Sequence, residues 1–132
     1  MRVNLQSESA VPIYEQILAQ VVFAVAAGDL PAGESVPSVR ELAQRLLVNA
    51  NTVSRAYQEL ERLGVVEARR GVGMFVTDGG PKVCRERRKV LVRDRVRETA
   101  REAAAAGLSL DELRQLLDDE WPRRNGHAKS PR

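Results

Sequence analysis

An amide, a hydroxyl and a guanidinium group occur close together in the sequence at Asn51, Thr52 and Arg55. Such groups can form hydrogen bonds with base edges and with phosphates in the major groove of DNA. The plain alternative is that the three side chains only solvate an exposed helix. The choice between these interpretations depends on the elements that position the three residues.

Residues 48–64 are predicted to form one helix with two different faces. At about 100° per residue, one stripe is apolar and suited to burial. It consists of Val53, Ala56, Tyr57, Leu60 and Gly64. The opposite face carries Asn51, Thr52, Arg55 and Arg62. Because Glu59 follows the first two turns and would repel phosphate, only the amino-terminal half of the helix is expected to meet DNA.

A second short helix is predicted immediately upstream, over residues 38–46. Its apolar side consists of Val39, Leu42, Ala43 and Leu46. Ser38 and Glu41 have the spacing of a capping box, and Asn49 is suited to cap the following helix. Two short helices joined by a tight turn indicate a helix-turn-helix, in which the first helix supports the second against DNA.

The chain before this pair predicts a further helix and a loop. Ile13, Ile17, Val21 and Val25 follow one another at steps of four, between Pro12 and Gly28. This helix is expected to pack behind the helix-turn-helix. The prolines and glycine of residues 29–37 break it and leave only a short extended piece around Ser35 and Val36.

Two β-rich runs, over residues 65–69 and 73–77, predict a hairpin after the recognition helix. A hairpin in this position is a wing. Its tip holds Arg69 and Arg70 beside two glycines, so it is suited to approach phosphate or the minor groove. The alternative is a plain exposed hairpin.

The remaining chain predicts a linker, two helices and a tail. Residues 78–82 are rich in glycine and are expected to form the linker, residues 83–121 a helical region, and residues 122–132 a disordered tail. Ser109 and Glu112 repeat the capping-box spacing. The last helix has a strong apolar face of Leu110, Leu113, Leu116, Leu117 and Trp121. Two amphipathic helices cannot form an isolated core, so they need another surface, either the winged domain or a second copy of themselves. We expect the second copy, with dimerisation through Leu113, Leu116, Leu117 and Trp121.

Composition and charge exclude several classes of protein. A chain of 132 residues has room for one ordinary domain, or a small domain with an appended helical segment. No apolar run is long enough to span a bilayer and no signal peptide is evident, so a cytoplasmic protein without membrane contact is expected. The single Cys84 and single His127 leave no disulfide framework, metal cluster or catalytic triad. No catalytic residues, enzymatic activity, metal or cofactor are therefore expected.

Charge is distributed unevenly along the chain. Residues 1–80 hold seven Lys/Arg against nine Asp/Glu, a net charge of −2, whereas residues 81–132 hold fourteen against nine, a net charge of +5. The case for DNA binding therefore depends on where individual arginines lie. The basic helix over residues 85–101 is either a solvated strut or an auxiliary phosphate contact, and interleaved acidic residues favour the strut.

These residues together resemble the GntR-type bacterial transcription regulators. The resemblance covers residues 10–77 and includes PIYEQI, LPAGESVPSVRELA, VNANTVSRAYQELERLG and VVEARRGVGMFV. The short helical end is similar to the YtrA subfamily, whose members are homodimeric repressors. The resemblance implies a mainly α fold with a small β-hairpin, in which a winged helix-turn-helix precedes a short two-helix dimerisation region.

The resemblance also implies which residues contact operator DNA. By position these are Arg40, Asn51, Thr52, Ser54, Arg55, Arg70, Gly71 and Gly73. Two positions depart from the family pattern, since Leu47 stands where glycine is usual and Ala50 where proline is common. Leucine would strain the turn if the residue keeps a positive φ.

We therefore expect a sequence-specific, homodimeric repressor that binds a two-fold operator in double-stranded DNA. The competing hypothesis is a winged-helix module for protein–protein contact, which would have no reason to keep the Asn51, Thr52, Arg55 face small and polar. The sequence does not identify a small-molecule effector. The fifty or so residues after the wing are too few for an effector pocket within one subunit, but a pocket between subunits stays open.

Overall fold

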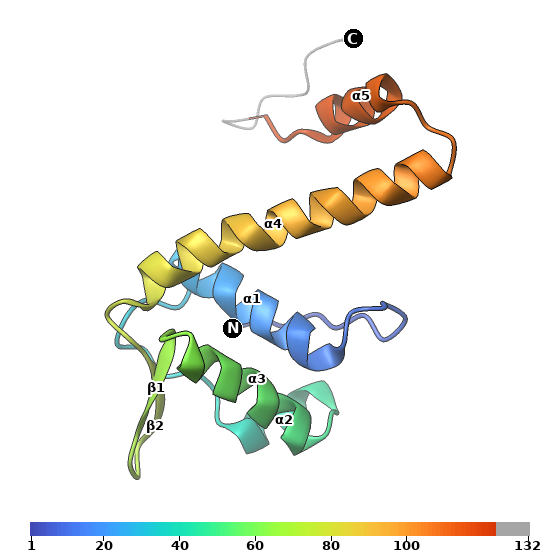
Figure 1. Ribbon diagram of the computed structural model, residues 1–132. Coiled ribbons are helices and arrows are strands. Elements are labelled where there is room, and N and C mark those ends of the chain that lie inside the picture. The colour runs from blue at the N-terminus through green and yellow to red at the C-terminus, as the bar shows by residue number, and fades with distance from the viewer. Residues whose placement is uncertain (124–132) are drawn as a thin grey trace. The chain divides into compact units, whose positions relative to one another are not determined.

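The computed structural model describes residues 1–123, which form helices and one two-stranded hairpin (Figure 1). In chain order the elements are α1 (Ile13–Ala27), α2 (Val39–Leu46), α3 (Ala50–Arg62), β1 (Val66–Arg69), β2 (Gly73–Val76), α4 (Gly80–Ala105) and α5 (Leu110–Glu120). The predicted fold class, a mainly α chain with a small β-hairpin, is confirmed. Met1–Leu91 forms one compact unit, and the described residues from Val92 onward belong to a second.

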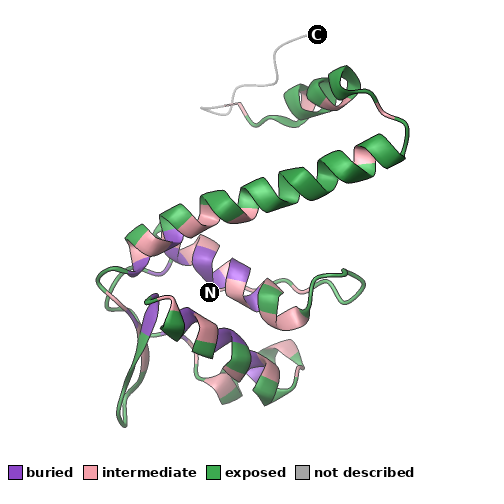
Figure 2. Cartoon of the chain, in the orientation of Figure 1, coloured by how far each residue is buried: buried purple, intermediate pink, exposed green. Residues whose placement is uncertain are grey.

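Helices α1 and α3 supply most of the core of the first unit, and their buried faces appear in purple in Figure 2. On α1 the side chains of Ile17, Val21 and Val25 are buried, as the four-residue spacing predicts. On α3 the buried residues are Val53, Ala56, Tyr57 and Leu60. The opposite face of α3 therefore stays available to solvent.

Tyr57 connects the core to the loop before α2. Its hydroxyl donates a hydrogen bond of 2.7 Å to the carbonyl oxygen of Pro37, and burial raises the pKa of the phenol. The bond holds the start of α2 against α3, because a buried hydroxyl needs a partner.

Both helices of the helix-turn-helix begin at the predicted capping residues. Ser38 Oγ accepts a hydrogen bond from the backbone N–H of Glu41 at 3.0 Å, and Asn49 Oδ1 accepts one from Asn51 N–H at 2.7 Å. Between them Leu47 ends α2 in the left-handed region, with φ 57° and ψ 45°. The turn has thus kept the positive φ that glycine usually provides.

The hairpin extends from the end of α3 and pairs with the loop before α2. Val66 lies opposite Val76 and Arg69 opposite Gly73, which leaves residues 70–72 as the tip. Ser35 forms an isolated bridge with Phe75, and Val36 N–H donates to Met74 O at 2.9 Å. The short extended piece predicted around Ser35 is confirmed, and it supports one side of the hairpin.

The structure corrects the expected linker over residues 78–82. Helix α4 already begins at Gly80, so residues 80–82 are helical. Gly80 is buried, and a Cβ atom at this position would lie 2.9 Å from the carbonyl oxygen of Val65. Cys84, one turn later, belongs to the core. The beginning of α4 therefore completes the first unit.

The first residues of the chain also belong to this unit. Gln20 pairs with the backbone N–H and C=O groups of Asn4, and Gln16 pairs with those of Gln6 at 2.8 and 3.0 Å. Two glutamines one helical turn apart on α1 therefore hold an extended segment. The alternate residues Met1, Val3 and Leu5 pack against the core.

The second unit exposes most of its apolar side chains. Helix α5 begins with the predicted capping box, since Ser109 and Glu112 exchange side-chain to backbone hydrogen bonds of 2.9 and 3.1 Å. Within residues 92–123 no side chain is buried. The expected disordered tail falls, from residue 124 onward, outside the described residues. No helix within residues 1–123 is long and apolar enough to cross a membrane.

Candidate DNA-binding surface

The first two turns of α3 present the predicted polar residues at the surface. Asn51 and Arg55 are exposed, whereas Thr52 and Ser54 are half-buried at the two sides of the helix. The backbone N–H of Thr52 donates to Asn49 O at 3.0 Å, so the first turn is well ordered by its cap. The polar face thus lies opposite Val53 and the rest of the buried stripe.

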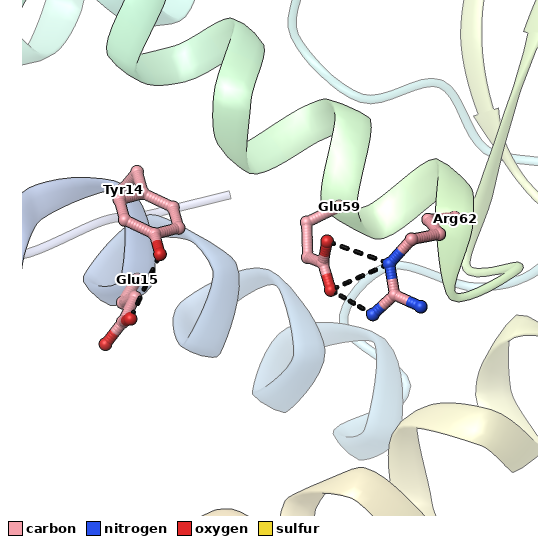
Figure 3. A network of polar contacts seen from close by, with 4 residues as sticks. All are labelled: Tyr14, Glu15, Glu59 and Arg62. Atoms are coloured by element: carbon pink, nitrogen blue, oxygen red, sulfur yellow. Dashed lines mark hydrogen bonds and ion pairs between the residues drawn. The ribbon is translucent and has the colours of Figure 1, made fainter.

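Arg55 contacts the aromatic ring of Tyr14 on α1. Its guanidinium carbon lies 3.8 Å from the ring centroid, which is a cation–π geometry. The Tyr14 hydroxyl donates to Glu15 Oε1 at 3.1 Å, and this hydrogen bond raises the pKa of Tyr14 (Figure 3). The contact brings the Arg55 guanidinium to the side of α3 that faces α1, while the residue stays exposed.

The second half of α3 carries a compensated charge pair. Glu59 accepts hydrogen bonds from Arg62, including two from Nε at 3.0 and 3.1 Å (Figure 3). These bonds lower the pKa of Glu59. Arg62 was predicted to point away from the core, and it does, but its charge is engaged with Glu59. Positive charge available to phosphate is therefore concentrated nearer the start of the helix.

Gln58 is a candidate that the sequence interpretation missed. It is exposed, and it follows Ser54 by one turn and Asn51 by two turns on the same face of α3. A glutamine amide offers a donor and an acceptor, the combination that suits an adenine edge. Its seven-residue spacing from Asn51 was the signal that would have identified it.

Arg40 lies exposed in the first turn of α2. The other arginine of this helix, Arg45, has two partners, since its Nη2 lies 3.8 Å from Glu41 and its Nη1 donates to Met1 O at 3.2 Å. Arg45 therefore connects α2 to the amino-terminal segment, whereas Arg40 projects from the beginning of the helix.

The two arginines at the wing differ in their surroundings. Arg69 lies in β1 with its guanidinium carbon 4.2 Å from the Phe75 ring centroid and its Nη2 3.7 Å from Glu67. Arg70 is exposed at the tip. Gly71 and Gly73 have φ of 74° and 133°, which lets the backbone turn within three residues. The tip therefore presents Arg70 and bare backbone, while Arg69 is held along the strand.

No cluster of His, Cys, Asp or Glu side chains that could hold a metal ion occurs within residues 1–123. Cys84 is fully buried, and burial raises the pKa of its thiol to about 11. A buried neutral thiol is a poor nucleophile, so this residue acts in packing.

Known proteins with similar sequences include transcription regulators. Residues 13–76 match the family model described as bacterial regulatory proteins of the gntR family. The HTH-type transcriptional repressor YtrA of Bacillus subtilis is 33% identical over 117 residues, which cover 89% of this chain and 90% of that protein.

Solved structures show the same likeness. A protein from Listeria monocytogenes, described as a transcriptional antiterminator, superposes with a TM-score of 0.67 and 36% identity over 89% of this chain and 88% of that chain. The structure of AraR(DBD) in complex with operator ORR3 gives a TM-score of 0.50 and 26% identity, covering 58% of this chain and 93% of that chain. In the AraR(DBD) structure, a similar domain is bound to its operator.

Proposed function

The chain belongs to the GntR family of bacterial DNA-binding transcription regulators, and from this we propose that it is a sequence-specific, homodimeric repressor. In this proposal each subunit places α3 in the major groove of one half-site and its hairpin on the adjacent backbone or minor groove. Occupation of the operator would block transcription. The name of the YtrA relative, which describes a repressor, supports this direction of regulation.

The observation that carries the proposal is the polar face at the amino-terminal end of α3. Asn51 is exposed in the first turn, and the buried Val53 holds the helix so that this amide points to solvent. An asparagine amide can donate a hydrogen bond to an adenine edge and accept one from it at the same time, so it can distinguish adenine from other bases. Contacts with phosphate carry no such sequence information. We therefore assign base recognition to Asn51, with Gln58 as a second candidate.

The remaining residues of the surface are assigned to positioning on the backbone. Arg40 at the start of α2 and the hydroxyls of Thr52 and Ser54 are suited to phosphate, because such contacts orient a helix without selecting a sequence. Arg55 can donate hydrogen bonds to phosphate from the N–H groups at the edge of its guanidinium, because Tyr14 stacks on the face of that group. The wing would contribute Arg70 and the backbone of Gly71 and Gly73, with Arg69 in a supporting position.

Dimerisation is assigned to the second unit. Leu116, Leu117 and Trp121 have exposed fractions of 48%, 51% and 62%, and Leu113 is half-buried. Apolar side chains of this size contribute no stabilising free energy while they remain in water. A second copy of the same helical region would cover them and remove their surface from water. An isologous contact of this kind brings two recognition helices to a two-fold DNA site.

The proposal is tested by selecting bound duplexes from a random pool with the full-length protein. We expect enrichment of two inverted half-sites, because a two-fold dimer presents two copies of α3. The selected duplex is then bound in a mobility shift with an unrelated duplex as competitor. If the folded protein enriches no sequence, the proposed function is wrong, and the competing hypothesis of a protein-contact module gains support.

A further inference from the structure

Leu47 combines a strained backbone with an uncovered apolar side chain. It lies in the turn between α2 and α3 with φ 57°, and it is the one residue other than glycine with a positive φ within residues 1–123. Its side chain is 91% exposed, more than any other large hydrophobic side chain in this part of the chain. Both features concern the same residue and neither is explained by packing.

The turn itself does not need this side chain. The backbone N–H groups of Leu47 and Val48 both donate to Ala43 O, the latter at 3.1 Å, and these bonds would remain with glycine at position 47. Glycine adopts the left-handed region without steric cost, whereas a leucine does not. Because its side chain stays in water, Leu47 also contributes no hydrophobic free energy to folding. Backbone strain that no contact within the protein offsets often marks a functional site. We therefore expect the Leu47 side chain to make a stabilising contact with another molecule.

The place of Leu47 indicates which molecule that is. Leu47 comes two residues before Asn49, the cap of α3, and four before Asn51, the proposed base-reading residue. The turn therefore lies beside the end of α3 that would enter the major groove. The apolar feature that DNA presents in this groove is the C5-methyl group of thymine.

We propose that Leu47 is a specificity-determining residue that packs against a thymine methyl group at the edge of each half-site. This inference rests on the proposed function, since it requires α3 to bind in the major groove. It goes beyond that function by adding an apolar determinant to a surface otherwise made of polar groups. Each half-site should then contain a thymine whose methyl group contributes to affinity.

The test uses full-length protein and the duplex that the wild-type protein selects from a random pool. Three variants separate side chain from backbone: Leu47→Gly and Leu47→Asn remove the apolar group and tolerate a positive φ, whereas Leu47→Met keeps an apolar side chain. We expect about a fourfold loss of affinity per half-site for Gly and Asn, the factor given by burial of one methyl-sized group, and near wild-type affinity for Met. The thermal midpoint of Leu47→Gly should equal or exceed that of the wild type.

The thymine is identified by replacing each thymine of the selected duplex in turn with deoxyuridine, which lacks the methyl group. At one position per half-site, the replacement should weaken the wild-type protein by about fourfold and leave Leu47→Gly unaffected. Equal affinity of Leu47→Gly and wild type would overturn the proposal, as would a wild-type affinity that no deoxyuridine replacement lowers, or a replacement that lowers the affinities of wild type and Leu47→Gly equally. Failure of the wild type to select any sequence would instead contradict the proposed function, so the two failures are distinguishable.

Discussion

The guanidinium carbon of Arg55 lies 3.8 Å from the centre of the Tyr14 ring, so α1 holds in place a residue that we propose for DNA contact. The contact predicts a coupling of about 0.5–1 kcal/mol between the two residues in the free energy of unfolding, the range for an exposed cation–π pair. It is measured by a double-mutant cycle of Tyr14→Ala and Arg55→Ala under chemical denaturation. Tyr14→Phe is the matched control, because it keeps the ring and removes only the hydroxyl.

The same variants separate support from DNA contact. Arg55→Ala should weaken binding to operator and random duplexes alike and lower the salt slope by about one, without unfolding. Tyr14→Ala should have a smaller effect, since it removes the support and leaves the charge. Titration of a fluorescent operator duplex gives both values. Unchanged affinity in a folded Arg55→Ala protein would remove Arg55 from the contact surface.

Gly80 and Gly79 form a matched pair for testing how α4 joins the first unit. A Cβ atom at Gly80 would lie 2.9 Å from the carbonyl oxygen of Val65 and 3.1 Å from Val76 Cγ1, whereas one at Gly79 meets nothing within 4 Å. Gly80→Ala is therefore expected to destabilise the protein by about 1–3 kcal/mol, the usual cost of overpacking. Gly79→Ala should be close to neutral. Denaturant unfolding measures both, and equal stability of the two variants would show that α4 does not pack against the hairpin.

Much of the first unit could be predicted from the sequence because its signals are local. Ser38, Asn49 and Ser109 each lie within three residues of the backbone group that they cap, and the apolar stripe of α3 repeats every three to four residues. These patterns require no knowledge of the fold.

The features that were missed depend on contacts between distant parts of the chain. Gln20 binds the backbone of Asn4, sixteen residues away, and a polar amino-terminal segment gives no periodic signal for such a contact. Gly79, Gly80 and Pro81 were interpreted as a linker because glycine and proline usually interrupt helices. Proline is nevertheless tolerated in a first helical turn, and Gly80 is needed where α4 approaches Val65. The pairing of Arg55 with Tyr14 likewise became visible only when α1 and α3 were placed together.

The wing predicts a difference between two neighbouring arginines. Arg70 is exposed at the tip, whereas Arg69 contacts Phe75 and Glu67. Arg70→Ala should therefore weaken binding to operator and random DNA alike and lower the salt dependence by about one phosphate contact, with a smaller effect for Arg69→Ala.

The control for the wing lies on the basic helix. The double variant Arg85→Gln, Lys89→Gln removes two exposed charges from α4, which we interpret as a solvated strut. Its salt slope should equal that of the wild type. If the double variant lowers the slope by about two, the DNA contact extends to α4. If Arg70→Ala loses affinity only for duplexes with a particular base at one position, the wing reads sequence directly.

Dimerisation should depend on the apolar face of α5. Replacing Leu116, Leu117 and Trp121 with serine in the full-length chain should convert dimers to monomers in sedimentation, because these exposed side chains are the ones that a second copy would cover. Glu120→Ser, on the same helix, is the control and should remain dimeric. A triple variant that still sediments as a dimer would place the interface elsewhere.

Asn51 is proposed to read a base from the first turn of α3, and two parallel selections test this role. Wild-type protein and Asn51→Ala are each used to select duplexes from the same random pool, and the two enriched sites are aligned. We predict that Asn51→Ala relaxes the preference at one base pair in each half-site, at two symmetric positions, with a loss of about 1–3 kcal/mol on the original site. An unchanged base preference at every position, in a variant that folds and binds, would contradict the claim.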